Sequence, residues 1–338
     1  MKIAIHHNPN SFSERWIEYC KKERIDYKLV NAFNNNIIEQ LKDCDAFMWH
    51  HHHADFKDVT AAKKILFALE HAGIKVFPDF KTGWHFDDKV AQKYLLEAIG
   101  APLVPSYVFY DKKEAIDWAK QTSYPKVFKL KGGAGATNVK LVKTEREAIQ
   151  LINIAFGKGF AQFDRINNLK ERFNKFRSGK GSFLSVLKGI ARLFITTKFA
   201  RQQCPEKGYI YFQEFIPNNN FDTRVVVVGG VKAAAEKRFV RENDFRASGS
   251  DKFSYEDISN EVIKISFEVA NKLKLQSVAF DFVLDVNNKP LIIEISYGFG
   301  TKGIEGVPGY WDSQLKWHEG KFNPQEWMVD EVIKLLEG

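Results

Sequence analysis

The sequence predicts an α/β protein (α+β in its later part) with a parallel-sheet domain at its N-terminus. In the first 80 residues short apolar strands alternate with helices, an order typical of a parallel sheet. From residue 124 onward the predicted strands come in pairs joined by glycine or asparagine turns, which indicates hairpins. With 338 residues the chain is long enough for two or three packed subdomains.

The N-terminal part contains four predicted strands, at residues 2–7, 25–30, 45–51 and 74–80. The intervening helices are predicted at 12–23, 35–43 and 58–73, and the last of them ends on Gly73, a residue type that commonly stops helices. A linker over 81–89 then leads into a helix predicted over 89–100.

The later part is richer in strands. Residues 124–143 read as two strands around a glycine-rich turn, and 208–217 and 221–240 are β-rich, with a hairpin turn at Gly229-Gly230. A helix is predicted over 259–275, followed by strands at 277–286 and 289–297 that join at Asn287-Asn288.

Composition narrows the class of protein. The sequence is 44% hydrophobic and 27% charged, as in ordinary soluble proteins, and no apolar run approaches the ~20 residues that span a bilayer. The first ten residues lack the apolar core of a secretion signal, so we expect the mature chain to start near Met1. Three scattered cysteines (Cys20, Cys44 and Cys204) fit a reducing cytoplasm.

The net charge of +8 is concentrated in one segment. Residues 158–207 hold 12 Lys and Arg against 3 Asp and Glu. Within 165–201, Ser182 is a plausible N-cap for a helix. The apolar residues of this helix follow helical spacing: Phe183, Leu187, Ile190 and Phe194. Cations occupy the remaining surface: Lys188, Arg192, Lys198 and Arg201.

Such a basic amphipathic helix is typical of binding to an anionic membrane surface or an acidic glycan. It would then place a cytoplasmic protein at the inner face of the membrane. The alternative is a helix packed on its own domain with a solvated basic face. Because no recognition motif is visible, nucleic acid is not expected as a partner.

A glycine-rich turn and two lysines suggest phosphate binding. Glycines let backbone N–H groups approach phosphate oxygens, and a nearby lysine neutralises the charge. The alternative is a common glycine-rich hairpin, and the Gly-Lys-Ser/Thr of a Walker loop is missing. The residues concerned are Lys129, Lys131, Gly132, Gly133 and Gly135.

Two acids stand inside apolar runs of the last predicted hairpin. Asp281 lies between Phe280 and Phe282, and Glu294 between Ile293 and Ile295. Burying carboxylates there is costly without a cation, and carboxylate oxygens together with phosphate are the ligands that Mg²⁺ prefers. The pattern favours a metal site over a pair of surface charges on an edge hairpin.

Three arginines lie between the glycine-rich turn and the acidic hairpin. Arg224, Arg238 and Arg246 are spaced along predicted strands and a loop. Arginines on rigid elements suit bidentate contacts to phosphate or carboxylate, whereas a single one is usually a salt bridge.

The order of these motifs resembles that of the ATP-grasp superfamily, particularly RimK-type and glutathione-synthetase-like ligases, over residues 86–300. The resemblance implies an ATP-grasp fold behind a Rossmann-like (pre-ATP-grasp) domain. We therefore expect domains at 1–85, at 86–216 with a basic helical insertion at about 157–207, and at 217–338.

The resemblance also implies roles for the residues. Lys89 and Lys129, with Lys131, would hold ATP phosphates under the loop from Gly132 to Gly135. Gln213, Glu214, Phe215 and Ile216 would form the adenine hinge, with Asp222 near the ribose. Arg224, Arg238 and Arg246 would contact phosphate and the acyl-phosphate intermediate, and Asp281, Glu294 and Ser296 would be the metal ligands.

Two positions depart from the family pattern. Ser296 stands where relatives carry the Asn of Glu-x-Asn, and Ser248 stands where they carry an Asn after the last arginine. Both changes replace an amide side chain by a shorter hydroxyl, which is a weaker ligand for the second Mg²⁺ ion. The aromatic ending after Tyr297 is similar to that of ATP-grasp proteins from surface-polysaccharide gene clusters.

Seven of the nine histidines fall at predicted strand ends or in the linker: His6, His7, His50 to His53, and His85. Ligands bind outside the carboxyl ends of parallel strands. One interpretation is that one or two histidines cap a strand and the others are solvated. The other is that His7, His50 and His52, with Ser248, line an acceptor or carboxylate pocket. Consecutive side chains on a strand point to opposite faces, so the run cannot bind one metal.

The predicted function is an ADP-forming carboxylate–amine ligase that uses ATP and one or two Mg²⁺ ions and passes through an acyl phosphate. The acid would be a small molecule or glycan such as a uronic acid or amino acid, the partner an amine, and a homodimer is compatible with the sequence. The rivals are an ATP-grasp kinase without an amine acceptor, and a membrane- or glycan-binding protein with a vestigial nucleotide site.

Overall fold

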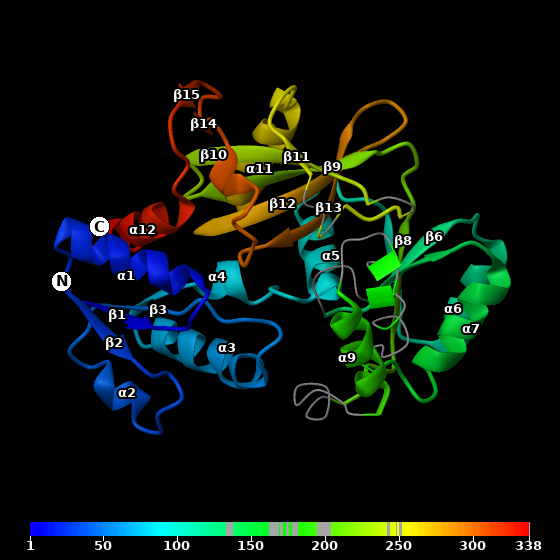
Figure 1. Ribbon diagram of the computed structural model, residues 1–338, viewed down its shortest axis with the longest axis horizontal. Coiled ribbons are helices and arrows are strands. Elements are labelled where there is room, and N and C mark those ends of the chain that lie inside the picture. Colours follow the sequence, from blue (N-terminus) through cyan, green and yellow to red (C-terminus); the bar gives the residue numbers. More distant parts are fainter. Residues whose placement is uncertain are drawn as a thin grey trace. The chain divides into compact units, whose positions relative to one another are not determined.

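The computed structural model describes residues 1–132, 138–161, 169, 172–173, 176–177, 182–194, 204–241, 244–247, 249 and 252–337 (Figure 1). These residues form two compact units. The first combines Met1–Leu103 with Ile216–Gly338, and the second is Val104–Phe215. The chain therefore leaves the first unit once and returns to it once. The finer division at residues 85 and 216 stays a prediction.

The N-terminal sheet is parallel, as predicted. Its strand order is β2-β1-β3-β4, with all three pairings parallel, and the strands are β1 (Ile3–His6), β2 (Tyr27–Val30), β3 (Ala46–Met48) and β4 (Lys75–Phe77). The helices between and after them are α1 (Phe12–Glu23), α2 (Ile37–Gln40), α3 (Phe56–His71) and α4 (Phe80–Gly83).

Most boundaries in this part differ from the prediction by one to three residues, and two of the differences have a visible cause. Strand β3 ends at Met48 rather than at residue 51, because the N–H of His51 donates to Trp49 O (3.0 Å) and turns the chain. Helix α3 begins at Phe56 rather than at residue 58. Its N-cap, Asp55, accepts hydrogen bonds from the N–H groups of Lys57 and Asp58, which the apolar spacing alone does not reveal.

The first unit also contains a seven-stranded sheet of order β13-β12-β9-β10-β14-β15, with β11 paired to β10. Its strands are β9 (Phe221–Val228), β10 (Lys232–Phe239), β11 (Phe253–Ser254), β12 (Ser277–Leu284), β13 (Pro290–Ser296), β14 (Gly309–Asp312) and β15 (Trp317–Glu319). Helix α11 (Asn260–Leu273) packs on one face, and α5 (Lys89–Ala98) contacts β13. The hairpins predicted at Gly229-Gly230 and Asn287-Asn288 are confirmed.

The opposite face of this sheet is divided along its strands. Near one end Val226, Val228, Ala234 and Ala279 join a core cluster with side chains of the N-terminal sheet. Toward the other end, the same face carries charged residues of β9, β10 and β12, because side chains alternate with a period of two. The apolar end of this face is packed in the core, so the strands can hold the charged side chains at the other end in fixed positions.

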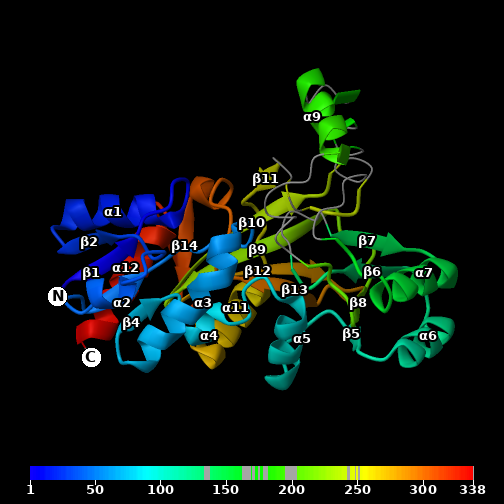
Figure 2. The ribbon, with the colours of Figure 1, turned by 90° about the horizontal axis from the view of Figure 1, so that it is seen from below.

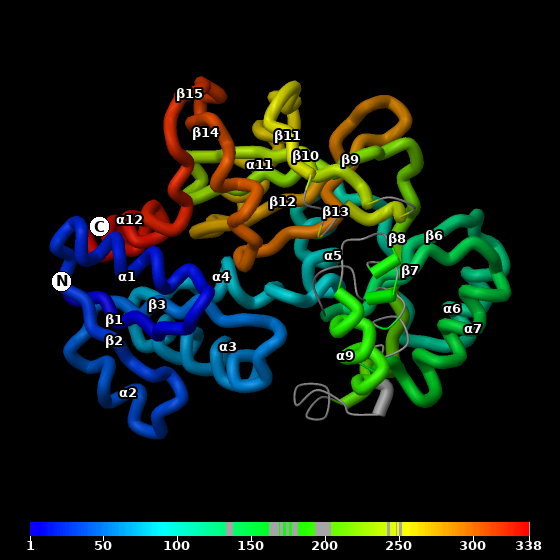
Figure 3. Tube along the Cα trace, viewed as in Figure 1, coloured from blue at the N-terminus to red at the C-terminus, as the bar shows by residue number. Residues whose placement is uncertain are grey.

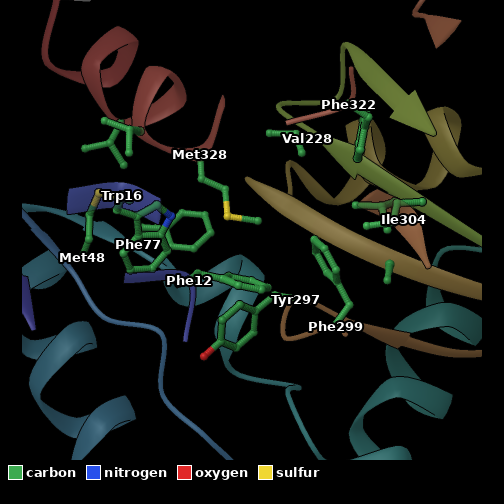
Figure 4. Close-up of a cluster of buried hydrophobic side chains, with 14 of the residues drawn as sticks. Phe12, Trp16, Met48, Phe77, Val228, Tyr297, Phe299, Ile304, Phe322 and Met328 are labelled. Carbon is green, nitrogen blue, oxygen red and sulfur yellow. The ribbon is translucent and has the colours of Figure 1, made fainter. Parts of the chain in front are cut away.

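The core cluster in Figure 4 joins early and late segments of the chain. Trp16 and Phe77 from the N-terminal part pack with Tyr297, Phe299 and Met328 from the C-terminal part. The last helix, α12 (Pro324–Glu337), lies beside α1 at the start of the chain (Figures 1 and 3). A hydrogen bond from Tyr19 Oη to Asp330 Oδ1 (2.7 Å) joins the two helices. The short helix η1 (Ile304–Gly306) precedes β14.

The second unit is an antiparallel sheet of order β5-β8-β6-β7. Its strands are β5 (Ser106–Phe109), β6 (Lys126–Lys129), β7 (Val139–Val142) and β8 (Ile210–Glu214), and α6 (Lys112–Gln121) and α7 (Glu145–Ala155) pack against it (Figure 2). Helix α9 (Phe183–Phe194) begins after Ser182, whose Oγ accepts from the N–H of Ser185 (3.3 Å), which confirms the predicted cap. No helix in the described part of the chain is long and apolar enough to cross a membrane.

Candidate active site

A set of charged side chains lies on one face of three neighbouring strands of the first unit. Asp222 and Arg224 come from β9, Glu236 and Arg238 from β10, and Asp281 from β12. In the strand register Asp222 faces Arg238, and Arg224 lies between Glu236 on one side and Asp281 on the other. We call these five residues the charged face.

The two arginines of the charged face are each held by an aspartate. Arg238 donates from Nε and Nη2 to the two carboxylate oxygens of Asp222 (2.7 and 2.6 Å). Arg224 donates in the same way to Asp281 (2.8 and 3.0 Å), and Arg238 Nη2 also lies 2.8 Å from Asp281 Oδ2. Bidentate pairs of this kind fix the guanidinium planes, so the arginines are oriented before any ligand arrives.

These ion pairs keep Asp281 charged. Burial alone would raise the pKa of its carboxyl group, but the guanidinium groups of Arg224 and Arg238 hold that pKa below its ordinary value. Asp281 is therefore an ionised, hard oxygen donor at neutral pH, as the predicted role of metal ligand requires.

The predicted metal ligand Glu294 lies opposite Asp281 in the register of β12 and β13. Its Oε1 is 3.2 Å from Nζ of Lys89, the buried first residue of α5. Helix α5 places Lys89 there because its N-cap, Asp88, accepts from the N–H groups of Val90 and Ala91 (3.1 and 3.0 Å). The predicted phosphate ligand Lys89 and the predicted metal ligand Glu294 are thus direct neighbours.

The facing carboxylates fit a Mg²⁺ ion whose coordination is completed by phosphate. Mg²⁺ is usually bound through one or two carboxylates together with substrate phosphates and water. Among the described residues no group of three or more His, Cys, Asp and Glu side chains could hold a metal ion. The third predicted ligand, Ser296, donates its Oγ hydrogen to Gly298 O (2.8 Å), which leaves oxygen lone pairs for a ligand or a water.

The remaining predicted residues of this region lie elsewhere or outside the described part. Arg246 pairs with Asp244, its Nε and Nη2 donating to the carboxylate over 2.7–2.9 Å, rather than with the aspartates of the charged face. Ser248, Gly133 and Gly135 lie outside the described residues.

The second unit brings together a separate group of predicted nucleotide ligands on β6 and β8. Lys129 donates from Nζ to Gln213 Oε1 (2.6 Å), and Gln213 Nε2 donates to Ser106 Oγ (3.0 Å). These side chains are buried, so the chain positions Lys129 by hydrogen bonds rather than leaving it in solvent. Phe215 and Ile216 follow the end of β8.

The sequence analysis does not predict one residue of this group, Lys126. Its side chain is 1% exposed, and its Nζ donates to both carboxylate oxygens of Glu214 (2.7 and 2.8 Å). The N–H of Glu214 donates to Pro105 O (2.9 Å), so this backbone donor of the predicted hinge is already engaged. A lysine and a glutamate inside two apolar strands are the signal that could have revealed the pair.

Hydrogen bonds within the second unit hold both ends of the glycine-rich turn. The N–H of Lys131 donates to Tyr209 Oη (2.8 Å), and Asn138 Nδ2 donates to Gly132 O (3.4 Å). Both ends of the turn are therefore anchored by side chains in this unit, and the turn joins β6 to β7 as predicted.

The predicted substrate histidines lie in two places. His7 Nδ1 is 3.2 Å from Ser13 Oγ, and His50 accepts from the N–H of Phe12 (3.1 Å), so both contact the start of α1. The His50 ring stacks on Phe12, and burial lowers the pKa of His50 to about 3. His52 is exposed and accepts from the N–H of Ala54 (3.0 Å) before α3. Their role in substrate binding stays a prediction.

The charged face also contains Glu236, which the sequence analysis does not single out. It is 1% exposed, and its Oε2 has no hydrogen-bond partner among the described residues. Burial raises the pKa of Glu236 to about 7, against the opposing effect of Arg224 and Arg238. The available signal was its position after three alanines and two residues before Arg238, which places both side chains on one face of the strand.

Two family models match successive parts of the chain. The RimK-like ATP-grasp domain matches residues 189–310, and the ATP binding domain of the carbamoyl-phosphate synthase L chain matches residues 88–178. The first match contains the charged face and the Asp281–Glu294 pair, and the second contains Lys89 and Lys129. The match to an ATP binding domain bears out ATP as the cofactor, and enzymes handle ATP together with Mg²⁺.

Curated relatives include two ligases. The alpha-aminoadipate–LysW ligase LysX of Saccharolobus solfataricus is 23% identical over 72% of this chain and 70% of its own length. The ribosomal protein bS6–L-glutamate ligase of Escherichia coli is 32% identical, but the match spans 30% of this chain and 35% of that protein. Both relatives are ligases, the class of enzyme that the predicted resemblance implies.

A solved structure of a RimK domain ATP-grasp protein from Sphaerobacter thermophilus has the same fold. It is 14% identical, with a TM-score of 0.61, and the match covers 98% of this chain and all of that one. With the two family matches, this likeness confirms the resemblance that the motifs predicted. The predicted resemblance to ATP-grasp proteins is therefore confirmed, and residues 189–310 are similar to a RimK-like ATP-grasp domain.

Proposed function

We propose that this protein is an ADP-forming carboxylate–amine ligase that makes an amide through an acyl phosphate. The observation that carries the proposal is the charged face, where Arg224 and Arg238 lie in fixed orientation next to the facing carboxylates Asp281 and Glu294. Cations beside a metal-binding pair suit a reaction in which a phosphoryl group is transferred and then leaves.

The reaction balances without a covalent nucleophile on the protein. A substrate carboxylate oxygen bonds to the γ-phosphorus of ATP as the bond to the bridging oxygen breaks and ADP leaves. The amine nitrogen then attacks the acyl carbon, the carbon–oxygen bond to phosphate breaks, and the nitrogen loses a proton. Arg224 and Arg238 would stabilise negative charge on phosphate and acyl oxygens, Asp281 and Glu294 would hold Mg²⁺, and Lys89 and Lys129 would neutralise the ATP phosphates.

For the substrates, we propose an amino acid or a sugar acid as the carboxylate and a primary amine as the acceptor. The two curated relatives are named for joining aminoadipate to LysW and L-glutamate to ribosomal protein bS6, which supports an amino acid as one of the two substrates. A role in modifying a surface polysaccharide rests on the aromatic ending of the chain and remains part of this proposal.

The test is ADP release from Mg-ATP over a matrix of carboxylates, including uronic and amino acids, and amines, with mass spectrometry of the products. A Glu294→Gln variant removes one facing carboxylate, and Glu319→Gln, at an exposed position of β15, is the matched control. ADP that requires both an acid and an amine, and that disappears only in Glu294→Gln, supports the ligase. ADP with a stable phosphate ester and no need for an amine would identify a kinase instead.

A second proposal concerns helix α9, which we propose docks the protein on an anionic membrane surface. Val186 and Gly189 are buried, whereas the neighbouring face exposes large apolar side chains, with Leu184 at 68%: Phe183, Leu184, Leu187 and Ile190. Lys188 and Arg192 border that face. Exposed apolar residues with adjoining cations suit insertion at the headgroup level, and this would place the protein at the inner membrane face.

Sedimentation with vesicles tests this docking. We expect binding to vesicles of phosphatidylglycerol and phosphatidylcholine, weaker binding to pure phosphatidylcholine, and a loss of at least tenfold on changing Leu184 and Leu187 to Ser. Val286→Ser is the control, because Val286 is 81% exposed but lies in the β12–β13 turn. Equal binding of both variants, or binding to an acidic polysaccharide in place of vesicles, would contradict the membrane proposal.

A further inference from the structure

Glu236 is the one carboxylate of the charged face without a matching cation. Asp222 is held by Arg238, and Asp281 by Arg224 and Arg238. The five residues thus carry three negative charges against two positive ones when all are ionised. Burying a carboxylate without a partner is unfavourable, because nothing in the protein replaces the water that it loses.

The space around Glu236 is closed by a glycine. A Cβ added at Gly303 would lie 1.9 Å from Glu236 Oε2, so only a residue without a side chain fits there. Gly303 lies just before η1, and its carbonyl accepts a hydrogen bond from Tyr255 Oη (2.8 Å). The loop that follows β13 therefore covers the carboxylate with backbone only.

We propose that Glu236 is the recognition site for the ammonium group of the amine substrate, a role that rests on the proposed ligase function. An ammonium group supplies the missing positive charge and a donor for the unpartnered oxygen. Glu236 lies opposite Arg224 in the strand register, so an amine bound there is held on the same face as the residues proposed to act on phosphate.

The chemistry of the site favours an ammonium group over an anion or a second guanidinium. The carboxylate repels anions, and burial raises its pKa although Arg224 and Arg238 act in the opposite direction. Gly303 approaches Oε2 without a side chain of its own, and such a narrow approach suits a compact cation better than a planar group with several donors. The expected acceptor is thus a primary amine such as that of an amino acid or amino sugar.

The two half-reactions separate this role from the ligase function itself. Hydroxylamine is small and uncharged at neutral pH, and it converts an acyl phosphate into a hydroxamate without needing an ammonium site. Wild-type protein is first screened with Mg-ATP, hydroxylamine and the panel of carboxylates, and the active acid is then tested with a panel of amino acids and amino sugars. Glu236→Gln, Glu236→Asp and Gly303→Ala are compared with the exposed control Glu319→Gln.

For Glu236→Gln we expect hydroxamate formation within about twofold of wild type and a KM for the amine raised at least tenfold, which corresponds to about 1.4 kcal/mol. Glu236→Asp keeps the charge and should recover part of the affinity. Gly303→Ala, which presses on Oε2 and leaves the charge in place, should raise the same KM.

Three results would overturn the inference. They are an unchanged KM for the amine in a folded Glu236→Gln variant, an equal fall in hydroxamate and amide formation, and failure of both Glu236→Asp and Gly303→Ala to alter the KM. Failure of the ligase proposal looks different, because wild-type protein would then form neither hydroxamate nor amide with any acid. Thermal unfolding of each variant identifies those that have lost their fold.

Discussion

At the scale of single residues, the ion pair between buried Lys89 and Glu294 is expected to affect both activity and stability. The lysine is buried while the carboxylate is one-third exposed, and their 3.2 Å contact neutralises both. Changing Glu294 to Gln removes one charged partner of buried Lys89 and, at the same position, a proposed Mg²⁺ ligand. We expect ADP formation to fall at least 100-fold, and the free energy of unfolding to fall by about 1 kcal/mol, because the pair is partly solvated.

Steady-state ADP release and urea unfolding of Glu294→Gln measure the two effects. The exposed Glu319→Gln control should change neither quantity. Full activity in a folded Glu294→Gln variant would contradict the assignment of Glu294 to the reaction.

His85 predicts a pH dependence of stability. It is 1% exposed, neither ring nitrogen has a partner among the described residues, and burial lowers its pKa from 6.5 to about 4. The unfolded chain therefore binds a proton more readily than the folded one between these values. The contribution of His85 to stability is therefore full above pH 6.5 and falls by about 1.4 kcal/mol per pH unit as the pH drops toward 4.

The His85→Phe variant should lack this contribution to the pH dependence of stability. Between pH 7.5 and pH 5.5 we expect the free energy of urea unfolding to fall by about 1.3 kcal/mol less in His85→Phe than in wild type. His71→Gln is the control, because His71 is exposed. An acid dependence equal to that of wild type would show that His85 does not account for it.

The types of residue at the site could be predicted from the sequence, but not all of their pairings. Arg224, Arg238, Asp281 and Glu294 were each identified from their surroundings in apolar strands, and the register brings them to neighbouring positions. Glu236 was missed because a single acid beside a lysine looks like a solvated pair in sequence. Only the pairing of β10 with β9 places it opposite Arg224.

At the scale of elements, helix caps decide where functional side chains lie. Asp88 caps α5 and so positions Lys89 at Glu294, whereas Asp111 caps α6 in the second unit and accepts from the N–H of Glu114 (2.9 Å). Removing either cap by substitution with Ala should lower stability by about 1 kcal/mol. Only Asp88→Ala should also lower ADP formation, about tenfold, because Lys89 loses its fixed position.

Urea unfolding and ADP release of the two cap variants give a matched comparison. Equal activity of Asp88→Ala and Asp111→Ala, at similar losses of stability, would show that the position of Lys89 does not depend on this cap.

Elements with regular spacing were predicted well, and elements defined by distant contacts were not. The spacing of apolar residues gave the four parallel strands, α1 and α11, because each buries one face. Strands β14 and β15 and helix α12 were not predicted. Their aromatic and mixed sequences become regular only by pairing with β10 and packing on α1.

At the scale of the whole molecule, the core of the first unit depends on both ends of the described chain. Met328 of α12 is fully buried in the cluster that contains Trp16 and Phe77. Met328→Ala should lower the free energy of unfolding by about 2–5 kcal/mol. Leu335→Ala, on the exposed side of the same helix, should stay within about 0.5 kcal/mol of wild type.

Urea unfolding followed by tryptophan fluorescence measures both variants. A loss below about 1 kcal/mol for Met328→Ala would show that α12 is not part of the cooperative core. That the chain re-enters its first unit could not be predicted from local patterns, since it depends on contacts between distant residues, such as the bond from Gln276 Nε2 to Val76 O, which joins residues 200 positions apart.

The order in which the two units occur along the chain has a consequence for biosynthesis. Residues 104–215 are contiguous, so the second unit has all of its strands once this stretch has left the ribosome. Trp16 and Phe77, by contrast, must await Tyr297 and Met328, which are translated much later. A nascent chain stalled shortly after residue 215 therefore contains a folded second unit, while the apolar side chains of residues 1–103 still lack their C-terminal partners. Chaperones bind partly folded chains that expose apolar surface in this way.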